Sequence, residues 1–204
     1  GNTFVMDFSG DADGTFTQTF ADAINGANPT SMVVNDFDRD GAPDVAVVDS
    51  AGLSIKINTS NPANPFPNTA PTAQSVGTNP GTVATADFNR DGIPDLAVAS
   101  DTGVTVLLGD GNGGFPGIGV VPLAGASPAA KALGVVDYNR DGWPDLVSFG
   151  SDGVLNVLPN TGAPSVTGLF GTPILFDAGA SPSTVAVADM NTDGQEDLVV
   201  GNAG

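Results

Sequence analysis

Short apolar stretches alternate with polar turns along the whole chain, and the stretches come in pairs. The first stretches of the pairs are residues 32–34, 83–85, 133–136 and 185–187, and the second stretches are residues 45–48, 96–98, 146–147 and 198–200. Runs of this length that are rich in β-branched residues and bounded by turn residues are typical of buried strands. Each pair therefore predicts two short antiparallel strands joined by a polar loop.

A second hairpin follows each pair. Residues 104–108, a glycine-rich turn at 109–114 and Phe115 form its clearest copy, and residues 4–8, 10–14 and Phe16 repeat that pattern. The corresponding hairpins of the other copies begin with residues 53–57 and 154–158. Each period thus supplies about four short antiparallel strands, which is the content of one propeller blade.

The polar loops inside the pairs repeat almost residue for residue. They cover residues 36–44, 87–95, 137–145 and 189–197 and begin about fifty residues apart. All four follow the pattern Asp-x-Asp/Asn-x-Asp-Gly-x-x-Asp. We refer to them as loops 1 to 4 and number the positions of each loop from one to nine.

The repeats predict an all-β fold in a single domain over residues 1–204, a β-propeller of four repeats with four-stranded antiparallel blades. The sequence begins with the second hairpin of a blade and ends with the first hairpin of another. Pairing of the N- and C-terminal hairpins would complete a fourth blade and remove exposed sheet edges. A closed four-bladed ring is the simplest arrangement. An eight-bladed ring shared by two chains and a piece of a larger propeller stay open as alternatives.

Charge and composition narrow the chemistry. All but one of the 23 acidic residues are aspartates, and five basic residues leave a formal net charge of −18. This balance argues against nucleic acid and anionic membrane surfaces as partners, because both require clustered Lys and Arg. Cysteine and histidine are absent, which excludes disulfides, thiolate metal sites and the commonest general base. No apolar run approaches the length of a membrane span, so we expect no direct membrane insertion.

The loops have the spacing of an oxygen-lined cation site. Side-chain oxygens at positions one, three and five converge when the backbone curls, and glycine at position six permits the tight turn. Hard oxygen donors without nitrogen or sulfur select calcium over transition metals. Position twelve is never Glu, unlike in an EF-hand, so the aspartate at position nine is expected to close the shell. The sequence predicts about four Ca²⁺ ions, one per loop.

The pattern resembles the FG-GAP/VCBS repeat family, whose calcium loops link the first two strands of propeller blades, as in the heads of integrin α-subunits. The resemblance covers nearly the whole chain. It implies side-chain ligands at positions one, three, five and nine and a carbonyl ligand at position seven: Asp36, Asp38, Asp40, Ala42 and Asp44; Asp87, Asn89, Asp91, Ile93 and Asp95; Asp137, Asn139, Asp141, Trp143 and Asp145; Asp189, Asn191, Asp193, Gln195 and Asp197. Loop 4 departs at Thr192 and Glu196 but keeps its ligand positions, so weaker binding is expected there.

Other side chains of the repeat admit two interpretations. Position two carries Phe37, Phe88, Tyr138 and Met190, and this regular placement predicts packing between blades. Trp143 stands at a variable position, so it either stacks on a sugar or packs at the rim. The position-four residues Arg39, Arg90 and Arg140 either bind an anionic ligand or pair with neighbouring carboxylates. In the second hairpins, ordinary turn chemistry competes with a further cation site at Asp11, Asp13, Asp110 and Asn112.

These features favour a non-catalytic binding or adhesion module that is secreted, periplasmic or on the cell surface, where calcium is abundant. Its expected partner is a glycan or an extracellular protein, and its calcium ions are structural. The alternative is a structural or accessory subunit of a surface, filament or membrane-associated assembly, with a homo-oligomer among the options. A calcium-dependent polysaccharide-processing enzyme is the third hypothesis. It is disfavoured because histidine is absent and no acid outside the loops stands out.

Overall fold

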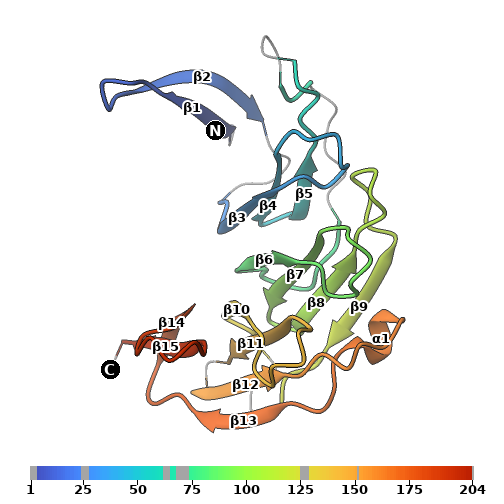
Figure 1. Ribbon diagram of the computed structural model, residues 1–204, viewed down its shortest axis with the longest axis vertical. Coiled ribbons are helices and arrows are strands. Elements are labelled where there is room, and N and C mark those ends of the chain that lie inside the picture. Colours follow the sequence, from blue (N-terminus) through green and yellow to red (C-terminus); the bar gives the residue numbers. More distant parts are fainter. Residues whose placement is uncertain are drawn as a thin grey trace.

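The computed structural model describes residues 4–23, 28–61, 65–67, 74–124, 129–150 and 152–203. Fifteen strands and one helical turn fill these residues, in five antiparallel sheets that follow one another along an arc (Figure 1). The elements are β1 (Phe4–Gly10), β2 (Phe16–Ala23), β3 (Ser31–Asn35), β4 (Asp44–Asp49), β5 (Gly52–Lys56), β6 (Val83–Ala86), β7 (Asp95–Ser100), β8 (Gly103–Leu108), β9 (Gly117–Val121), β10 (Ala132–Val136), β11 (Asp145–Phe149), β12 (Val154–Leu158), α1 (Val166–Leu169), β13 (Ile174–Asp177), β14 (Pro182–Ala188) and β15 (Asp197–Asn202).

Three of the sheets are blades. Blade A contains β3-β4-β5, blade B contains β6-β7-β8-β9 and blade C contains β10-β11-β12-β13, each in sequence order. The two remaining sheets are the N-terminal hairpin β1-β2 and the C-terminal hairpin β14-β15. The first strands β3, β6, β10 and β14 contact one another in turn and lie along the concave side of the arc (Figure 1). The predicted all-β architecture of antiparallel meanders is therefore confirmed.

The second strand of each blade is buried along its whole length. In β4, β7 and β11 every residue is buried, because both faces of each sheet are covered. Blades A and C cover β7, whereas Phe66 covers the outer face of β4 and the C-terminal hairpin covers that of β11. This is why these strands are continuous runs of Val, Ala and Leu and lack alternating polar positions. Side chains one residue apart therefore enter different cores: Leu96 and Val98 pack against blade A, whereas Ala97 and Ala99 pack against blade C.

Aromatic pairs join neighbouring blades at the loop end. Phe37 of loop 1 meets Phe115 of blade B edge-on, with ring centroids 5.6 Å apart. Phe88 of loop 2 meets Phe170 of blade C in the same way at 5.7 Å. Burial of such rings removes a large apolar area from water, and the edge-on geometry adds to the stabilisation. The helical turn α1, which the sequence analysis did not predict, places Leu169 in the same core as Phe170.

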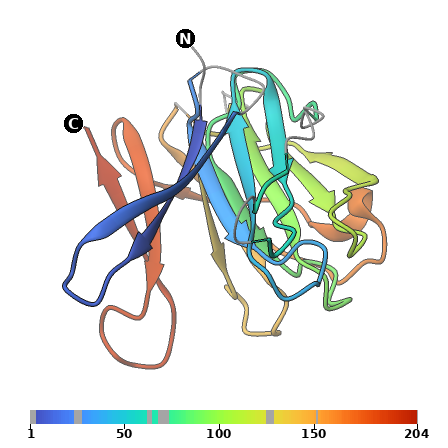
Figure 2. The same cartoon turned by 90° about the horizontal axis from the view of Figure 1, so that it is seen from above.

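The predicted ring closure is wrong for the described residues. The N- and C-terminal hairpins form separate two-stranded sheets, and both lie on the open side of the arc (Figures 1 and 2). The reason is geometric, since the packed side chains between blades fix a modest rotation per junction and five sheets do not complete a circle. Among the described residues, blade A has three strands, and next to its third strand Leu53 forms a single bridge with Gln74. No helix in the described part of the chain has the length and apolarity to span a membrane.

Candidate metal centres

Each loop connects the first strand to the second strand of its sheet, so the four loops lie at the same end of the array (Figure 2). Two residues in each loop have left-handed backbone, and together they curl the chain into a ring. Glycine occupies position six for this reason. Position four is also left-handed although it is never glycine, and this conformation is unfavourable for such residues. Its φ is 63° at Arg39, 55° at Arg90, 60° at Arg140 and 61° at Thr192.

Backbone amides orient the loop oxygens, as loop 2 illustrates. Asp87 accepts hydrogen bonds from the N–H groups of Asp91 (3.0 Å) and Gly92 (2.9 Å). The amide oxygen of Asn89 accepts a second bond from the Asp91 N–H, and Asp91 accepts one from the Ile93 N–H at 2.8 Å. These bonds fix the side chains of positions one, three and five on the inside of the loop. The side chains predicted as ligands are thus brought together by the local backbone alone.

The same bonds recur in the other loops. The N–H of the position-six glycine donates to the position-one aspartate at 3.0 Å in loop 1, 2.9 Å in loop 3 and 2.8 Å in loop 4. The position-seven residues Ala42, Trp143 and Gln195 donate their N–H groups to the position-five aspartate. Ligation by the position-seven carbonyls, including that of Ile93, stays a prediction.

Loop 1 brings three carboxylates to one point. One oxygen each of Asp36, Asp38 and Asp40 lies within 4.8 Å of the other two. Oxygens on opposite sides of a calcium ion are about 5 Å apart, so this spacing fits that ion. In loops 2 to 4, position three is asparagine, and its amide nitrogen donates to the position-five aspartate. A cation would replace this donor and leave the amide oxygen as a neutral ligand.

Loop 3 contains a buried carboxylate oxygen that has no donor. In loops 1, 2 and 4, the first oxygen of the position-one aspartate accepts the N–H of position five. The corresponding oxygen of Asp137 is buried and has no hydrogen-bond partner. A buried acceptor without a partner is costly, and a bound cation would satisfy it. The oxygen-only donor set and this orphaned atom both fit calcium.

The position-nine aspartate has a second task that the sequence analysis missed. Asp95 is fully buried, and its two oxygens accept the N–H of Phe88 at 2.9 Å and the N–H of Gly109 at 2.8 Å. Burial raises the pKa of Asp95 to about 6, while the hydrogen bonds from Gly109 and Phe88 act in the opposite direction. Asp95 therefore ties loop 2 to the end of the third strand of its blade.

Asp44 and Asp145 act in the same way. Their donors are the N–H groups of Phe37 and Asn58 for Asp44, and of Tyr138 and Asn160 for Asp145. Burial raises the pKa of both carboxyl groups as well. Asp44 lies outside the close carboxylate group of loop 1. Direct ligation by position nine stays a prediction, since each oxygen retains a second lone pair.

Two further contacts link one loop to the next blade. The buried amide of Asn160 donates to the carbonyl of Phe88 at 2.8 Å and to the carbonyl of Pro144 at 3.0 Å. Glu196, the departure of loop 4, accepts the N–H of Asp137 at 3.0 Å. The recurrence of asparagine after the third strand, at Asn58 and Asn160, was a signal for the first contact. No signal in the sequence pointed to the second.

The remaining candidates pack or make turns. The guanidinium carbon of Arg90 lies 4.5 Å from the ring centroid of Trp143, and the same indole lies against Gly162. This contact favours the packing interpretation of Trp143 over sugar stacking. Asp13 accepts two bonds from Thr15, which lower its pKa, and Asp110 accepts the N–H groups of Asn112 and Gly114. Ordinary turn chemistry accounts for these aspartates.

Comparison with known proteins agrees with the repeat. The FG-GAP-like repeat model matches residues 36–98, 87–148 and 137–200, and each match runs from one loop through the next. The chain belongs to the FG-GAP-like repeat family. No curated protein matches this FG-GAP repeat chain in a sequence search.

Two solved propeller proteins have a similar fold. BBS1N, crystallised in complex with ARL6DN and soaked with lead, superposes with a TM-score of 0.58 at 16% identity, over 88% of this chain and 52% of that one. An Agrocybe aegerita lectin, described as recognising non-reducing terminal N-acetylglucosamine, gives 0.54 at 19% identity, over 98% and 52%. The FG-GAP repeat chain thus spans about half the length of both. At this identity the likeness concerns the fold alone.

Proposed function

We propose that this FG-GAP repeat protein is a calcium-stabilised, non-catalytic binding module that works outside the cytoplasm, either secreted, periplasmic or on the cell surface. Calcium would be held by the side chains at positions one, three and five of each loop, together with the position-seven carbonyl and the position-nine aspartate. Its role is to neutralise the loop carboxylates and fix the hairpin. Extracellular calcium levels suit oxygen sites of this class.

The observation that supports this role most strongly is the repetition of one oxygen-lined loop at the same end of four sheets. Carboxylates crowded in this way repel each other unless a cation screens them. The chain contributes no histidine to do acid–base chemistry.

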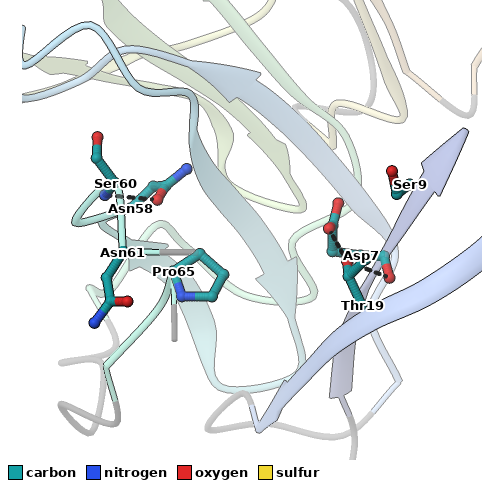
Figure 3. Close-up of a pocket in the computed structure, with 7 residues that line it drawn as sticks. All are labelled: Asp7, Ser9, Thr19, Asn58, Ser60, Asn61 and Pro65. Atoms are coloured by element: carbon teal, nitrogen blue, oxygen red, sulfur yellow. Dashed lines mark hydrogen bonds between the residues drawn. The ribbon is translucent and has the colours of Figure 1, made fainter. Parts of the chain in front are cut away.

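The groove between the N-terminal hairpin and blade A is the recognition surface that we favour (Figure 3). It encloses about 350 Å³. The hairpin contributes Asp7, Ser9 and Thr19, and the segment after β5 contributes Asn58, Ser60, Asn61 and Pro65. Asp7 and Thr19 are hydrogen-bonded to each other, and Asn58 accepts the N–H of Ser60 at 3.0 Å. Both walls therefore present oriented polar groups toward the opening.

This lining suits a glycan. Sugar hydroxyls pair with carboxylates, amides and side-chain hydroxyls, and an apolar ring such as Pro65 covers a sugar face. An acidic groove in a chain with net charge −18 disfavours an anionic polysaccharide, so a neutral sugar is the better match. The similar fold of the Agrocybe aegerita lectin supports a terminal N-acetylglucosamine residue as the first probe.

A second candidate function is that of a subunit in a protein assembly. Apolar side chains such as Phe16 and Met190 are exposed at the two ends of the array. BBS1N, whose fold is similar, was crystallised in a complex with another protein. This candidate differs from the first in the side chains it uses, since it depends on exposed apolar residues and not on the polar lining of the groove.

Calorimetric titration of the calcium-loaded protein with chitotriose, an N-acetylglucosamine oligomer, tests the glycan proposal. Maltotriose is the matched probe without acetamido groups. We expect saturable binding of chitotriose that Asp7→Ala weakens about tenfold or more, since a hydrogen bond to a charged group contributes about 1.5–3 kcal/mol. Ile118→Ser, on the outer strand β9, is the control and should bind as the parent does. Absence of binding to both sugars would refute glycan recognition at this groove.

A further inference from the structure

The two complete junctions of the array follow one rule. The position-two aromatic ring of a loop packs on a phenylalanine in the second hairpin of the next blade, as Phe37 does on Phe115 and Phe88 on Phe170. Phe37 is 1% exposed and Phe88 is fully buried. A loop and the second hairpin of the next blade thus form the two complementary sides of one interface between blades.

The N-terminal hairpin provides the second-hairpin side of such an interface, but no loop packs against it. The turn of this hairpin and the turn in blade B each contain an equivalent backbone hydrogen bond. In the hairpin the Asp11 N–H donates to the Thr15 carbonyl (2.8 Å), and in blade B the Asp110 N–H donates to the Gly114 carbonyl (2.9 Å). The residue after each bond is a phenylalanine, Phe16 in the hairpin and Phe115 in blade B. Phe115 is buried, whereas Phe16 is 73% exposed. Phe16 therefore lacks the ring that it is placed to meet.

The C-terminal end of the array provides the loop side of such an interface. Tyr138 occupies position two of loop 3 and is 43% exposed, with Phe176 at its edge 6.4 Å away. In the three blades, the first oxygen of the position-nine aspartate accepts an N–H from the end of the third strand. Among the described residues no such donor reaches Asp197, which binds only the Met190 N–H through its second oxygen. The C-terminal hairpin thus lacks a third strand that ends in an N–H.

The exposed apolar side chains mark the same two ends. In the described part of the chain, all of the exposed large apolar residues except Ile118 and Val120 lie on the terminal hairpins, on β3 of blade A, in loops 3 and 4 or on β13. Between the N-terminal hairpin and blade A there is a groove of about 210 Å³ whose apolar wall is formed by Met6, Met32, Val34, Val45 and Phe66. On the interior blades, the surfaces that correspond to this wall are covered by the neighbouring sheet.

We propose that two copies of this chain close into one ring, in which β15 of each copy pairs antiparallel with β1 of the other. Four strands then form a composite blade, β14-β15 from one copy and β1-β2 from the second. The repeat sets the register: β7 pairs with β8 as Leu96 with Leu107 and Val98 with Thr105. By this register Leu198 faces Phe8 and Val200 faces Met6 of the second copy.

The composite blade satisfies each unpaired feature. Phe16 of the second copy covers Tyr138, as Phe115 covers Phe37. The N–H of Gly10 of the second copy reaches Asp197, in the way that the Gly109 N–H reaches Asp95. The outer face of β15, which exposes Val199, enters the apolar groove against Met32 and Val34.

A second copy fits better than closure within one chain. The two hairpins that would have to pair are held at opposite ends of the arc by the three blades between them (Figure 1). The arc also superposes on two longer propeller proteins and covers 52% of each, which is compatible with further blades that complete a ring. Head-to-tail contacts that close after two steps give a discrete dimer and leave no free edge.

Sedimentation velocity of the calcium-loaded protein tests the proposal. We expect about twice the chain mass of 20.2 kDa at micromolar concentration. Phe16→Asp should give the monomer mass with an unchanged circular dichroism spectrum, because the ring is exposed within one chain. Ile118→Ser, an exposed apolar residue away from the ends, is the matched control and should remain dimeric. A monomeric parent protein, or a dimeric Phe16→Asp variant, would overturn the proposal.

Cross-linking tests the register independently. The chain has no cysteine, so Met6→Cys and Val200→Cys can be made as separate proteins and mixed. The mixture should form a disulfide between the two proteins upon oxidation, at a rate at least tenfold above that of Met6→Cys mixed with Val199→Cys, because neighbouring residues point to opposite faces of a strand. Equal rates for both mixtures would refute the proposed pairing.

The proposal is independent of the proposed function. Failure of ring formation leaves calcium binding and chitotriose binding unaffected, because neither the loops nor the polar groove needs β15 of a second copy. The two grooves share Asp7, Asn58 and Pro65, so chitotriose binding is measured on the parent protein and on the Phe16→Asp variant. A dimeric parent protein with no chitotriose binding in either protein removes the glycan hypothesis and keeps the ring.

Discussion

Loop 2 in blade B and loop 4 in the C-terminal hairpin have the same internal hydrogen bonds but very different surroundings. In both, the position-six N–H donates to position one and the position-seven N–H to position five, with distances that agree within 0.1 Å. Yet Phe88 at position two is fully buried, whereas Met190 is 65% exposed. Asp95 is likewise buried and Asp197 only half-buried.

The difference separates two levels of organisation. The internal hydrogen bonds of the loop are encoded within nine residues and form without a neighbouring sheet. The burial of position two depends on the next sheet, as the contacts of Phe37 with Phe115 and of Phe88 with Phe170 show. The second hydrogen bond at position nine depends on the third strand of the same sheet, as the bond from the Gly109 N–H to Asp95 shows. Stability of the array should therefore be sensitive to interior junctions and insensitive to the same residues at its end.

The largest contrast is expected at position two. Phe88→Ala removes a ring from the core between blades B and C and should lower the free energy of unfolding by about 3–5 kcal/mol. Met190→Ala, at the same loop position, should change it by less than about 0.5 kcal/mol. Urea unfolding of calcium-loaded protein measures both, in a Phe16→Asp background so that association does not contribute. Equal losses for the two variants would contradict the distinction between interior and end.

Position nine gives the second contrast. Asp95→Asn replaces one acceptor oxygen by a donor that faces the N–H of Phe88 or Gly109, so we expect a loss of about 2–3 kcal/mol. Asp197→Asn should lose about 1 kcal/mol, because Met190 is the one N–H partner among the described residues and the site is half-exposed. Any contribution from calcium ligation is common to both positions and cancels in the comparison. Thermal unfolding at saturating calcium compares them. A larger loss at Asp197 than at Asp95 would be inconsistent with a stabilising link from Asp95 to both loop 2 and the third strand.

The asparagine after the third strand gives a smaller contrast. Asn160→Ala removes the bonds to the carbonyls of Phe88 and Pro144 and the bond from the Gly162 N–H, and should cost about 2 kcal/mol. Asn58→Ala removes the bond to the Pro43 carbonyl and the bond from the Ser60 N–H, both in a more exposed place, and should cost about 1 kcal/mol. Hydrogen exchange of the Phe88 region should rise in the first variant alone. Unchanged exchange there would mean that Asn160 does not join blades B and C.

The smallest expected effect is electrostatic. Asp101 accepts a bond from Asn79 and one from Lys131, and these two partners lower its pKa. A carboxyl group whose pKa is lower in the folded state stabilises above its unfolded pKa of about 3.9 and loses that contribution as the pH falls. Asp101→Asn should cost about 0.2–1 kcal/mol at pH 7 and nothing at pH 2. A cost that persists undiminished at pH 2 would exclude this origin.

Much of the site was predictable from sequence because it is local. Alternate acidic positions and the glycine of each loop specify the curl, and the loop oxygens lie where the pattern places them. The strands before and after the loops also follow from their apolar runs. The hydrogen bond by which Asp95 links loop 2 to the third strand could not be predicted from the loop pattern, because its partner Gly109 follows another strand. A nine-residue pattern contains no information on such a partner.

Ring closure was not predictable for the same reason. The repeat count fixes how many sheets form, but the rotation between sheets depends on side chains packed across each junction, such as Phe37 on Phe115. Beside Leu53, the described residues of blade A form a single bridge with Gln74, where blades B and C have a fourth strand. Neither outcome follows from the period alone.

Equilibrium dialysis of chelator-stripped protein against calcium, with circular dichroism on the same samples, tests the central claim most directly. The account predicts that about four calcium ions bind per chain and that the β-sheet signal and the unfolding temperature rise as the sites fill. Uptake of no calcium, or uptake that leaves folding unchanged, would contradict the assignment of the loops as structural metal centres.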